Sequence, residues 1–220
     1  MSTPFKCACG NPRVVAVTFD LFDTLVTADR PDEPWDAVAG TLRERGVAIP
    51  DDWEAAYRSS HVDIERGAEL SLVEHTAAAL ASRGVGAEEE VVRDALLAAF
   101  DGPVTVRHGA VEAIRAARAS GPVGVLSNCS LPGLVERTLQ RAALPVEFDA
   151  VVTSVGCGWR KPHDRGFAAA AEALGVSPGE LVHVGDDPRA DGGGRTAGVT
   201  VVLTDEVPLA AFPDWLEDQE

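Results

Sequence analysis

The sequence predicts an α/β protein, with a Rossmann-like parallel sheet core and an inserted all-α helical cap. Three observations lead to this fold class. Residues 14–19 form an apolar, β-branched run that ends in Asp20, which is typical of a buried parallel strand. Residues 29–106 show apolar side chains at helical spacing and no convincing strand. From His108 onward, helical and strand-like segments alternate, which implies a parallel sheet with helices on both faces.

Four helices are expected in the inserted block. We expect the second to start at Asp51, whose side chain can cap it, with Glu54 three residues later as in a capping box. The fourth carries apolar residues along one side at helical spacing. The expected helices cover residues 35–45, the segment from 51 onward, 72–83 and 88–100.

The alternating part is expected to supply the other strands of the sheet. The strands are expected at residues 122–126, 150–153, 181–184 and 199–203. The helices are expected at residues 110–119, 134–143, 165–174, 189–197 and 209–216. We therefore assign residues 1–26 and 107–220 to the core and residues 27–106 to the cap. An all-α insertion at the catalytic edge of a sheet is well placed to act as a lid.

The composition excludes several classes of partner. A net charge of −16 disfavours nucleic acid and anionic membranes, because both select basic surfaces. The chain has no apolar window of roughly 18 residues, and residues 1–12 lack the apolar centre of a signal peptide. We expect a cytoplasmic protein with a small-molecule substrate; the sequence leaves its oligomeric state open. Only Lys6 and Lys161 are lysines, and such acid-rich, lysine-poor composition resembles that of halophilic proteins.

The cysteines are interpreted as free thiols. Cys7 and Cys9 are too close in sequence for the usual zinc spacing. A small metal site, or a redox pair formed by Cys129 and Cys157, is the alternative. His183 lies inside an expected strand, so we interpret it as a core histidine.

Polar side chains follow four of the expected strands. Asp20 follows the first and Ser127-Asn128 ends the second. A loop with Arg160-Lys161-Pro162 follows the third, and Gly185-Asp186-Asp187, with Asp191 nearby, ends the fourth. The carboxyl ends of parallel strands lie side by side, at the edge where ligands bind. A carboxylate, a hydroxyl, an ammonium and an acidic metal cluster are therefore expected to converge on one point.

This combination resembles the haloacid dehalogenase superfamily of hydrolases, over roughly the whole chain. The motifs that carry the resemblance are Asp20-x-x-Asp23-Thr24, Leu126-Ser127-Asn128, Lys161-Pro162 and Gly185-Asp186-Asp187 with Asp191. The resemblance implies that Asp20 is a nucleophile that forms a covalent intermediate. It also implies that Ser127 and Lys161 act in catalysis, and that Asn128, Thr24 and Asp23 contact the substrate.

The resemblance further implies a bound Mg²⁺, because oxygen ligands suit a hard cation. The implied ligands are Asp20, the backbone carbonyl of Phe22, Asp186, Asp187 and Asp191. A cation at this point offsets the repulsion between a carboxylate nucleophile and an anionic phosphate.

One position separates two activities within the family. Phosphatases of the superfamily carry an acid–base aspartate two residues after the nucleophile, where this chain has Phe22, and the nearby Asp23 replaces a usual glycine. Losing a general acid–base group commonly costs about two to four orders of magnitude in rate. The branch that cleaves carbon–halogen bonds has a non-acidic residue at this position. That branch works without metal, however, and usually lacks the first acid of the last cluster, which is Asp186 here.

Three hypotheses follow from this conflict. The preferred one is Mg²⁺-dependent hydrolysis of a small phosphorylated compound with a good leaving group, such as an acyl phosphate. The first alternative is a 2-haloacid dehalogenase, for which a cap arginine (Arg43, Arg45 or Arg58) would bind the substrate carboxylate. The second alternative is a non-catalytic protein that keeps the fold and a metal site.

Overall fold

The computed structural model describes residues 16–144 and 147–219, and its centre is a five-stranded sheet in which all neighbouring strands are parallel. The strand order is β5-β4-β1-β6-β7, so the first strand of the chain is the middle one. The strands are β1 (Ala16–Phe19), β4 (Val123–Ser127), β5 (Ala150–Thr153), β6 (Leu181–Gly185) and β7 (Thr200–Leu203). The predicted Rossmann-like α/β core is confirmed.

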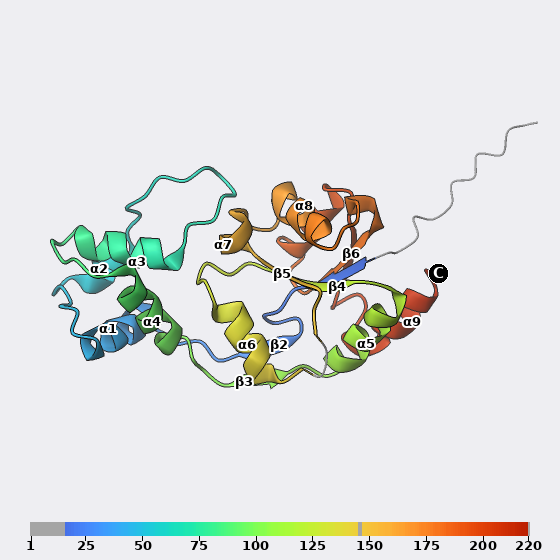
Figure 1. Cartoon of the computed structure of the whole chain (residues 1–220), viewed down its shortest axis with the longest axis horizontal. Helices are drawn as coiled ribbons and strands as arrows, with labels where there is room; N and C mark the ends of the chain where they lie inside the picture. Colours follow the sequence, from blue (N-terminus) through green and yellow to red (C-terminus); the bar gives the residue numbers. More distant parts are fainter. Residues whose placement is uncertain (1–15, 145–146, 220) are drawn as a thin grey trace, which may run out of the picture.

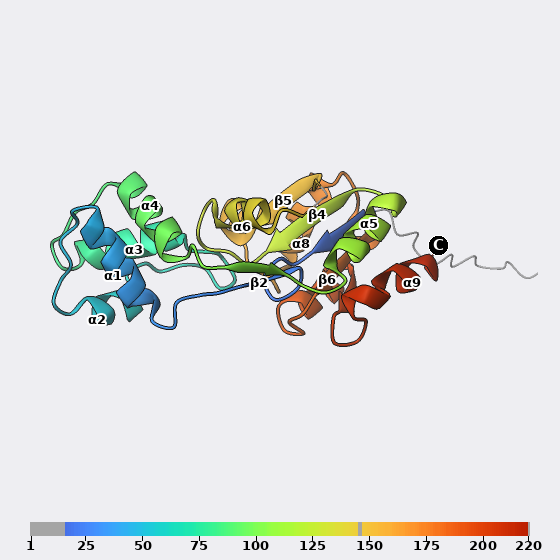
Figure 2. The ribbon, with the colours of Figure 1, turned by 90° about the horizontal axis from the view of Figure 1, so that it is seen from below.

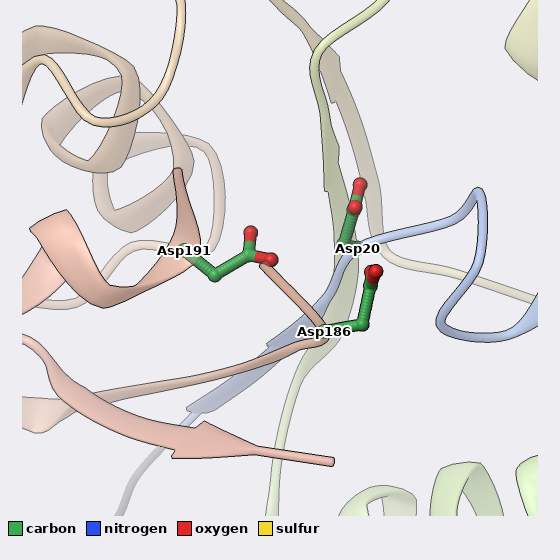
Figure 3. Close-up of side chains that lie close together, drawn as sticks. All are labelled: Asp20, Asp186 and Asp191. Atoms are coloured by element: carbon green, nitrogen blue, oxygen red, sulfur yellow. The ribbon is translucent and has the colours of Figure 1, made fainter. Parts of the chain in front are cut away.

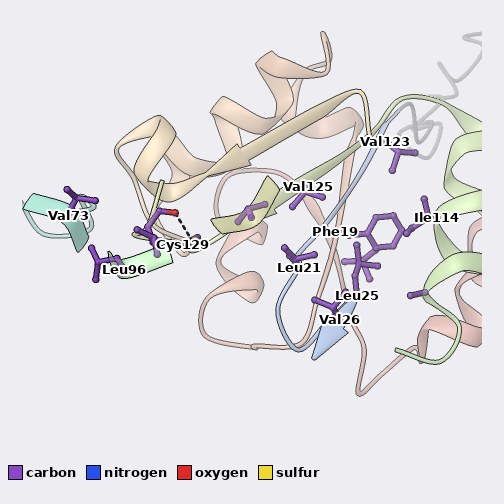
Figure 4. Close-up of a cluster of buried hydrophobic side chains, with 14 of the residues drawn as sticks. Phe19, Leu21, Leu25, Val26, Val73, Leu96, Ile114, Val123, Val125 and Cys129 are labelled. Atoms are coloured by element: carbon purple, nitrogen blue, oxygen red, sulfur yellow. Dashed lines mark hydrogen bonds between the residues drawn. The ribbon is translucent and has the colours of Figure 1, made fainter. Parts of the chain in front are cut away.

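Helices cover both faces of the sheet (Figure 1). Val17 and Phe19 of β1 join one buried apolar cluster, whereas Ala16 joins the other, as strand alternation requires. The first cluster packs under α5 (Ala110–Ser120), α6 (Leu134–Ala142) and α9 (Phe212–Glu217), and the second under α8 (Asp164–Ala173). Figure 4 shows the first cluster, with Phe19 beside Ile114.

A block of four helices interrupts the chain after β2 (Val26–Ala28) and ends before β3 (Val104–Val106). Figures 1 and 2 show the block apart from the sheet, past the carboxyl ends of its strands. Its helices are α1 (Pro34–Glu44), α2 (Trp53–Arg58), α3 (Leu72–Ala81) and α4 (Glu89–Ala99). β2 and β3 pair antiparallel, with Thr27 opposite Thr105. The expectation that residues 29–106 hold no strand was therefore wrong at β3.

The start of α2 also differs from the prediction. The helix begins at Trp53, and the residue before it, Asp52, makes no side-chain cap. The Asp52 carboxylate instead pairs with Arg83, with Nε 2.8 Å from Oδ2. The capping box expected from Asp51 and Glu54 was wrong, because the residue at the cap position is Asp52, one residue later than expected.

The helix expected at residues 189–197 is a short 3₁₀ helix, η2 (Asp191–Arg195). Three consecutive glycines weaken an α-helix here, and they also allow close packing. A Cβ on Gly193 would lie 2.2 Å from Pro162, and one on Gly194 would lie 2.9 Å from Phe167. Two other elements were unexpected: α7 (Ser154–Cys157) and η1 (Pro178–Glu180). The expected last helix divides into η3 (Leu209–Ala211) and α9. None of the helices in the described ranges is long and apolar enough to cross a bilayer.

Candidate active site

Asp20 directly follows the central strand and lies at the carboxyl edge of the sheet. Its backbone N–H donates to the Val184 carbonyl of β6 at 2.8 Å, which fixes the start of the loop. The Leu21 N–H donates to Asp20 Oδ1, also at 2.8 Å, which orients the carboxylate. The Asp20 side chain keeps 15% of its surface exposed, so a ligand in the adjoining cavity can reach it.

Lys161 brings a buried ammonium to this carboxylate. Lys161 Nζ lies 3.1 Å from Asp20 Oδ1 and 2.7 Å from Asp191 Oδ1, and it also donates to the Leu126 carbonyl at 2.8 Å. With its side chain 1% exposed, the ammonium has a partner for each of its three protons. The structure therefore places the predicted cation against the predicted nucleophile.

Asp191 is the counter-ion that holds Lys161 in place. The carboxylate is fully buried, and Oδ1 accepts from Lys161 and from His183 Nε2 at 2.9 Å. Oδ2 accepts from the Asp187 N–H, also at 2.9 Å. Burial alone would raise the pKa of Asp191, but the His183 hydrogen bond and the Lys161 charge hold this pKa well below its ordinary value. Both oxygens of Asp191 are thus already engaged.

His183 is a core histidine, as expected, with an added contact to the site. Its Nδ1 lies 3.0 Å from Thr18 Oγ1, and its Nε2 faces Asp191. Burial, and then the nearby Lys161 charge, lower the pKa of His183. A neutral imidazole then donates its Nε2 proton to Asp191 and accepts at Nδ1 from Thr18.

Thr24 positions a second carboxylate, Asp186, beside Asp20. The Thr24 hydroxyl is fully buried and donates to Asp186 Oδ1 at 2.7 Å. Partial burial raises the pKa of Asp186, the Thr24 hydrogen bond opposes this rise, and the charges of Asp20, Asp191 and Asp23 add to it. Acidic groups gathered this closely favour a cation between them.

The residues present fit a hard divalent cation. One carboxylate oxygen from each of Asp20, Asp186 and Asp191 lies within 4.8 Å of the others (Figure 3). The Asp191 oxygens already accept hydrogen bonds from Lys161, His183 and a backbone N–H. Asp20 and Asp186 are therefore the carboxylates best placed to hold Mg²⁺. Asp187 is exposed at the rim, with Oδ1 accepting from the Arg189 N–H. The Phe22 carbonyl as a further ligand stays a prediction.

Ser127 ends β4 and Asn128 follows it, but the two side chains have different surroundings. Both line a cavity of about 210 Å³, which Asp20, Lys161 and Asp186 also line. We call it the polar cavity. The Ser127 hydroxyl is buried and has no hydrogen-bond partner within the described ranges. The Asn128 amide, in contrast, accepts from Lys161 N at 2.8 Å and donates to Lys161 O at 2.9 Å. Asn128 was expected to contact substrate, and the structure shows its amide engaged in fixing the Lys161 backbone.

A second cavity of about 230 Å³ adjoins this polar cavity. Four residues line both: Phe22, Arg30, Asn128 and Arg160. Asp23, expected near the substrate, is exposed and lines only the polar cavity. Sequence reasoning missed Arg30, which stands in no strand-end motif, and it named Arg160 beside Lys161 without giving it a role. Arg43, Arg45 and Arg58 of the helical block, the candidates for binding a substrate carboxylate, line neither cavity.

A segment of the helical block docks beside Lys161. The Glu69 N–H donates to the Gly158 carbonyl at 2.9 Å, and the Arg160 N–H donates to the Gly67 carbonyl at 3.0 Å. The Glu69 carboxylate is nearly buried, accepts from the Ser154 hydroxyl and lies 2.6 Å from Arg160 Nη1. These contacts tie residues 67–69 to the loop that carries Lys161.

Both described cysteines are free thiols. Cys129 is buried and Cys157 is half-buried, with no disulfide between them. Burial raises the pKa of Cys129 to about 11, which makes its thiolate scarce at neutral pH. Cys7 and Cys9 lie outside the described residues.

Comparisons with known proteins agree on the family. The family model for haloacid dehalogenase-like hydrolases matches residues 14–198. A protein named phosphatase MT3486, from Mycobacterium tuberculosis, is 37% identical over 123 residues, 56% of this chain and 55% of that protein. A phosphoserine phosphatase from Thermus thermophilus is 39% identical over 90 residues, 40% of this chain and 36% of that protein. The chain thus aligns with about half or less of the length of these curated relatives.

Solved structures share the fold. A 2-haloacid dehalogenase from Pseudomonas syringae superposes with a TM-score of 0.69 at 20% identity, covering 94% of this chain and 100% of that one. An enzyme of the same family from Bacteroides thetaiotaomicron, solved with magnesium and inorganic phosphate, gives a TM-score of 0.56 at 15% identity. That match covers 86% of this chain and 93% of the other.

Proposed function

Because the chain belongs to the haloacid dehalogenase-like hydrolases, we propose that it hydrolyses a small phosphorylated compound, with Asp20 as nucleophile and Mg²⁺ as cofactor. The observation that carries this proposal is the polar cavity, which Asp20, Lys161 and Asp186 line together with Ser127, whose hydroxyl has no partner among the residues that the structure describes. Carboxylates, an ammonium and a free hydroxyl are what phosphoryl transfer through an aspartyl phosphate requires. The strongly acidic chain disfavours nucleic acid and membrane partners, so we propose a small-molecule substrate and a cytoplasmic setting.

Each side chain has a role in this proposal. Asp20 attacks the phosphorus atom while the Lys161 ammonium offers its charge to the phosphoryl oxygens. The Ser127 hydroxyl donates to one of these oxygens, which gives it the partner that it lacks among the described residues. Mg²⁺ held by Asp20 and Asp186, with Asp187 and the Phe22 carbonyl as further candidate ligands, would offset the repulsion between carboxylate and phosphate. Asp191, Asn128 and Thr24 position Lys161 and Asp186.

The helical block is proposed to be the cap. It is inserted between β2 and β3, and residues 67–69 reach the loop beside Lys161. Leu72, at the start of α3, lines the cavity that adjoins the polar one. Side chains of the block can therefore limit which substrates reach Asp20.

Turnover of a generic aryl phosphate tests the proposal. We expect hydrolysis that needs Mg²⁺, stops with EDTA and falls by more than about 1,000-fold in Asp20→Asn and in Asp186→Asn. Asp52→Asn is the matched control, because it removes the same charge from the helical block, where Asp52 pairs with Arg83. Equal turnover in Asp20→Asn and the unmodified protein, both folded by their melting curves, would rule the proposal out.

Dehalogenation is the second candidate function, and Phe22 favours it. The ring lines the polar cavity at the position where phosphatases of the family carry their acid. A halide leaves without a proton, so this chemistry needs no acid there. Chelator-insensitive halide release from a 2-haloacid would support this candidate against the first. Metal binding without either activity would instead support a non-catalytic protein.

A further inference from the structure

A substrate whose phosphoryl group occupies the polar cavity has a second cavity beside it for its leaving group. The reactive groups line the polar cavity, and the adjoining cavity has a volume of about 230 Å³. Phe22, Arg30, Asn128 and Arg160 form the border between the two. The second cavity is lined largely by apolar side chains, among them Leu72, Phe100, Leu131 and Leu134.

Arg30 is the available cation on this border. Its guanidinium carbon lies 4.9 Å from the centre of the Phe22 ring, a cation–π contact that holds the group beside the nucleophile loop. Arg160 is committed to Glu69, whereas no carboxylate pairs with Arg30 in the part of the chain that the structure describes. The Asn128 amide is committed to the Lys161 backbone. The border thus offers a substrate one uncommitted positive charge and, at Phe22, no proton donor.

We propose that Arg30, held against the Phe22 ring, stabilises the departing leaving group as an anion, in place of the proton that an acid would supply. This inference rests on the proposed phosphatase function. Asp20 attacks phosphorus, the bond to the leaving oxygen breaks, and that oxygen departs with the electron pair and a full negative charge beside Arg30. Water then attacks the phosphorus of the aspartyl phosphate, Asp20 regains its carboxylate, and the two protons of water stay with the released phosphate. The two steps balance without a general acid.

This arrangement selects the substrate class. Carboxylates and aryloxides are stable as anions, whereas alkoxides need a proton when they depart. Apolar walls around the border favour an apolar body on the leaving group. The structure therefore assigns a small acyl phosphate with an apolar acyl group as the preferred substrate, with aryl phosphates as accessible analogues and alkyl phosphates as poor ones.

A leaving-group series tests the inference. Pre-steady-state release of the leaving group isolates the first chemical step, for benzoyl phosphate, a set of aryl phosphates and one alkyl phosphate. We expect Arg30→Met to slow this step by about 100-fold, which is the effect of losing one group that stabilises an oxyanion. The rate should fall most for the least acidic leaving groups. Arg30→Lys should recover part of the rate. Phe22→Asp should flatten the dependence on leaving-group pKa, because it adds a proton donor.

Controls separate this inference from the proposed function. Arg115→Met removes an equal charge from the exposed face of α5 and should leave the series unchanged. The role of Arg30 would be overturned if Arg30→Met and the unmodified protein released every leaving group at the same rate. If Asp20→Asn remained inactive in the same experiment, the phosphatase assignment would still stand. Phosphate release from none of the substrates would overturn both.

Discussion

At the scale of single residues, the most costly feature of the site is a buried set of charges. Lys161 is 1% exposed and Asp191 is fully buried, and removing both from water carries a desolvation penalty of several kcal/mol per ion. The protein offsets this penalty with hydrogen bonds from His183 and the Asp187 N–H to Asp191, and from Lys161 to the Leu126 carbonyl. Such an arrangement is weak evidence for stability, but it fixes the ammonium against Asp20.

The Ser127 hydroxyl allows a test in which stability and activity separate. It is buried without a partner in the described ranges, so Ser127→Ala should leave the melting temperature unchanged or slightly higher. The same change should lower kcat/KM by about tenfold to a hundredfold, because a hydrogen bond to a charged phosphoryl group is lost. Thr76→Val is the matched control, because the Thr76 hydroxyl, in α3, is also buried and also lacks a partner in the described part of the chain. Equal loss of activity in both variants would contradict the role given to Ser127.

The sequence predicts the identity of these charged groups better than the role of their neighbours. Asp20, Lys161 and Asp186 each follow a predicted strand, and parallel strands bring such positions together. Asn128 also follows a strand, but its amide turns to the Lys161 backbone, and no pattern encodes that choice. Arg30 lies in a linker without periodicity, so only the folded chain places it over Phe22.

At the scale of elements, the junction between the helical block and the Lys161 loop depends on Glu69. Glu69→Gln weakens its contacts with Ser154 and Arg160. The amide protons of Glu69, Leu72 and Arg160 cross this junction to carbonyls of Gly158, Ser130 and Gly67, so they report on it. We expect their hydrogen exchange to speed up by about fivefold to tenfold, equivalent to the loss of one hydrogen bond.

Glu54→Gln is the control for this prediction, because Glu54 pairs with Arg58 on the exposed face of α2. It should leave the three amide protons unchanged. Unaltered exchange in Glu69→Gln would show that other contacts hold the junction.

The packing of α2 against α3 has a spectroscopic readout in Tyr57, the only tyrosine of the chain. Tyr57 lies between the rings of Trp53 and His75, and burial raises its pKa to about 12. Because the folded state holds this proton more tightly than an unfolded chain does, the stabilisation is complete below pH 10 and is lost as the pH rises toward 12. Alkaline titration followed by tyrosinate absorbance should therefore give a midpoint near 12. A midpoint near 10 before unfolding would mean that the helices are not packed this way.

The longer elements of the fold follow from sequence patterns, and the shortest do not. The strands of the core are continuous apolar runs, and the helices of the block have clear apolar faces, such as Val92 and Leu96 of α4. β2 and β3 are three residues each and pair across the whole helical block, so local periodicity carries no signal for them. The 3₁₀ helix η2 forms where glycines pack against Pro162 and Phe167, a tertiary effect that overrides the expected α-helix.

At the scale of the whole molecule, charge dominates the response to solvent. The chain carries 35 acidic and 19 basic side chains, and their net repulsion of like charges is screened by salt. We expect the melting temperature to rise by about 2–8 °C between 0.05 M and 1 M KCl, which corresponds to a gain of about 1–2 kcal/mol. The melting temperature in sucrose at matched osmolality is the control, because sucrose is excluded from the protein surface but does not screen charges. A melting temperature that falls with KCl would contradict the resemblance to halophilic proteins.

The central claim is that Asp20 becomes covalently phosphorylated during turnover, and borohydride trapping tests it most directly. Borohydride reduces an aspartyl phosphate to homoserine, which peptide mass spectrometry can locate in the chain. With benzoyl phosphate and Mg²⁺ present, we expect homoserine at position 20, and none when the substrate is left out. Sustained phosphate release with Asp20 unmodified, or homoserine at another aspartate, would contradict the account.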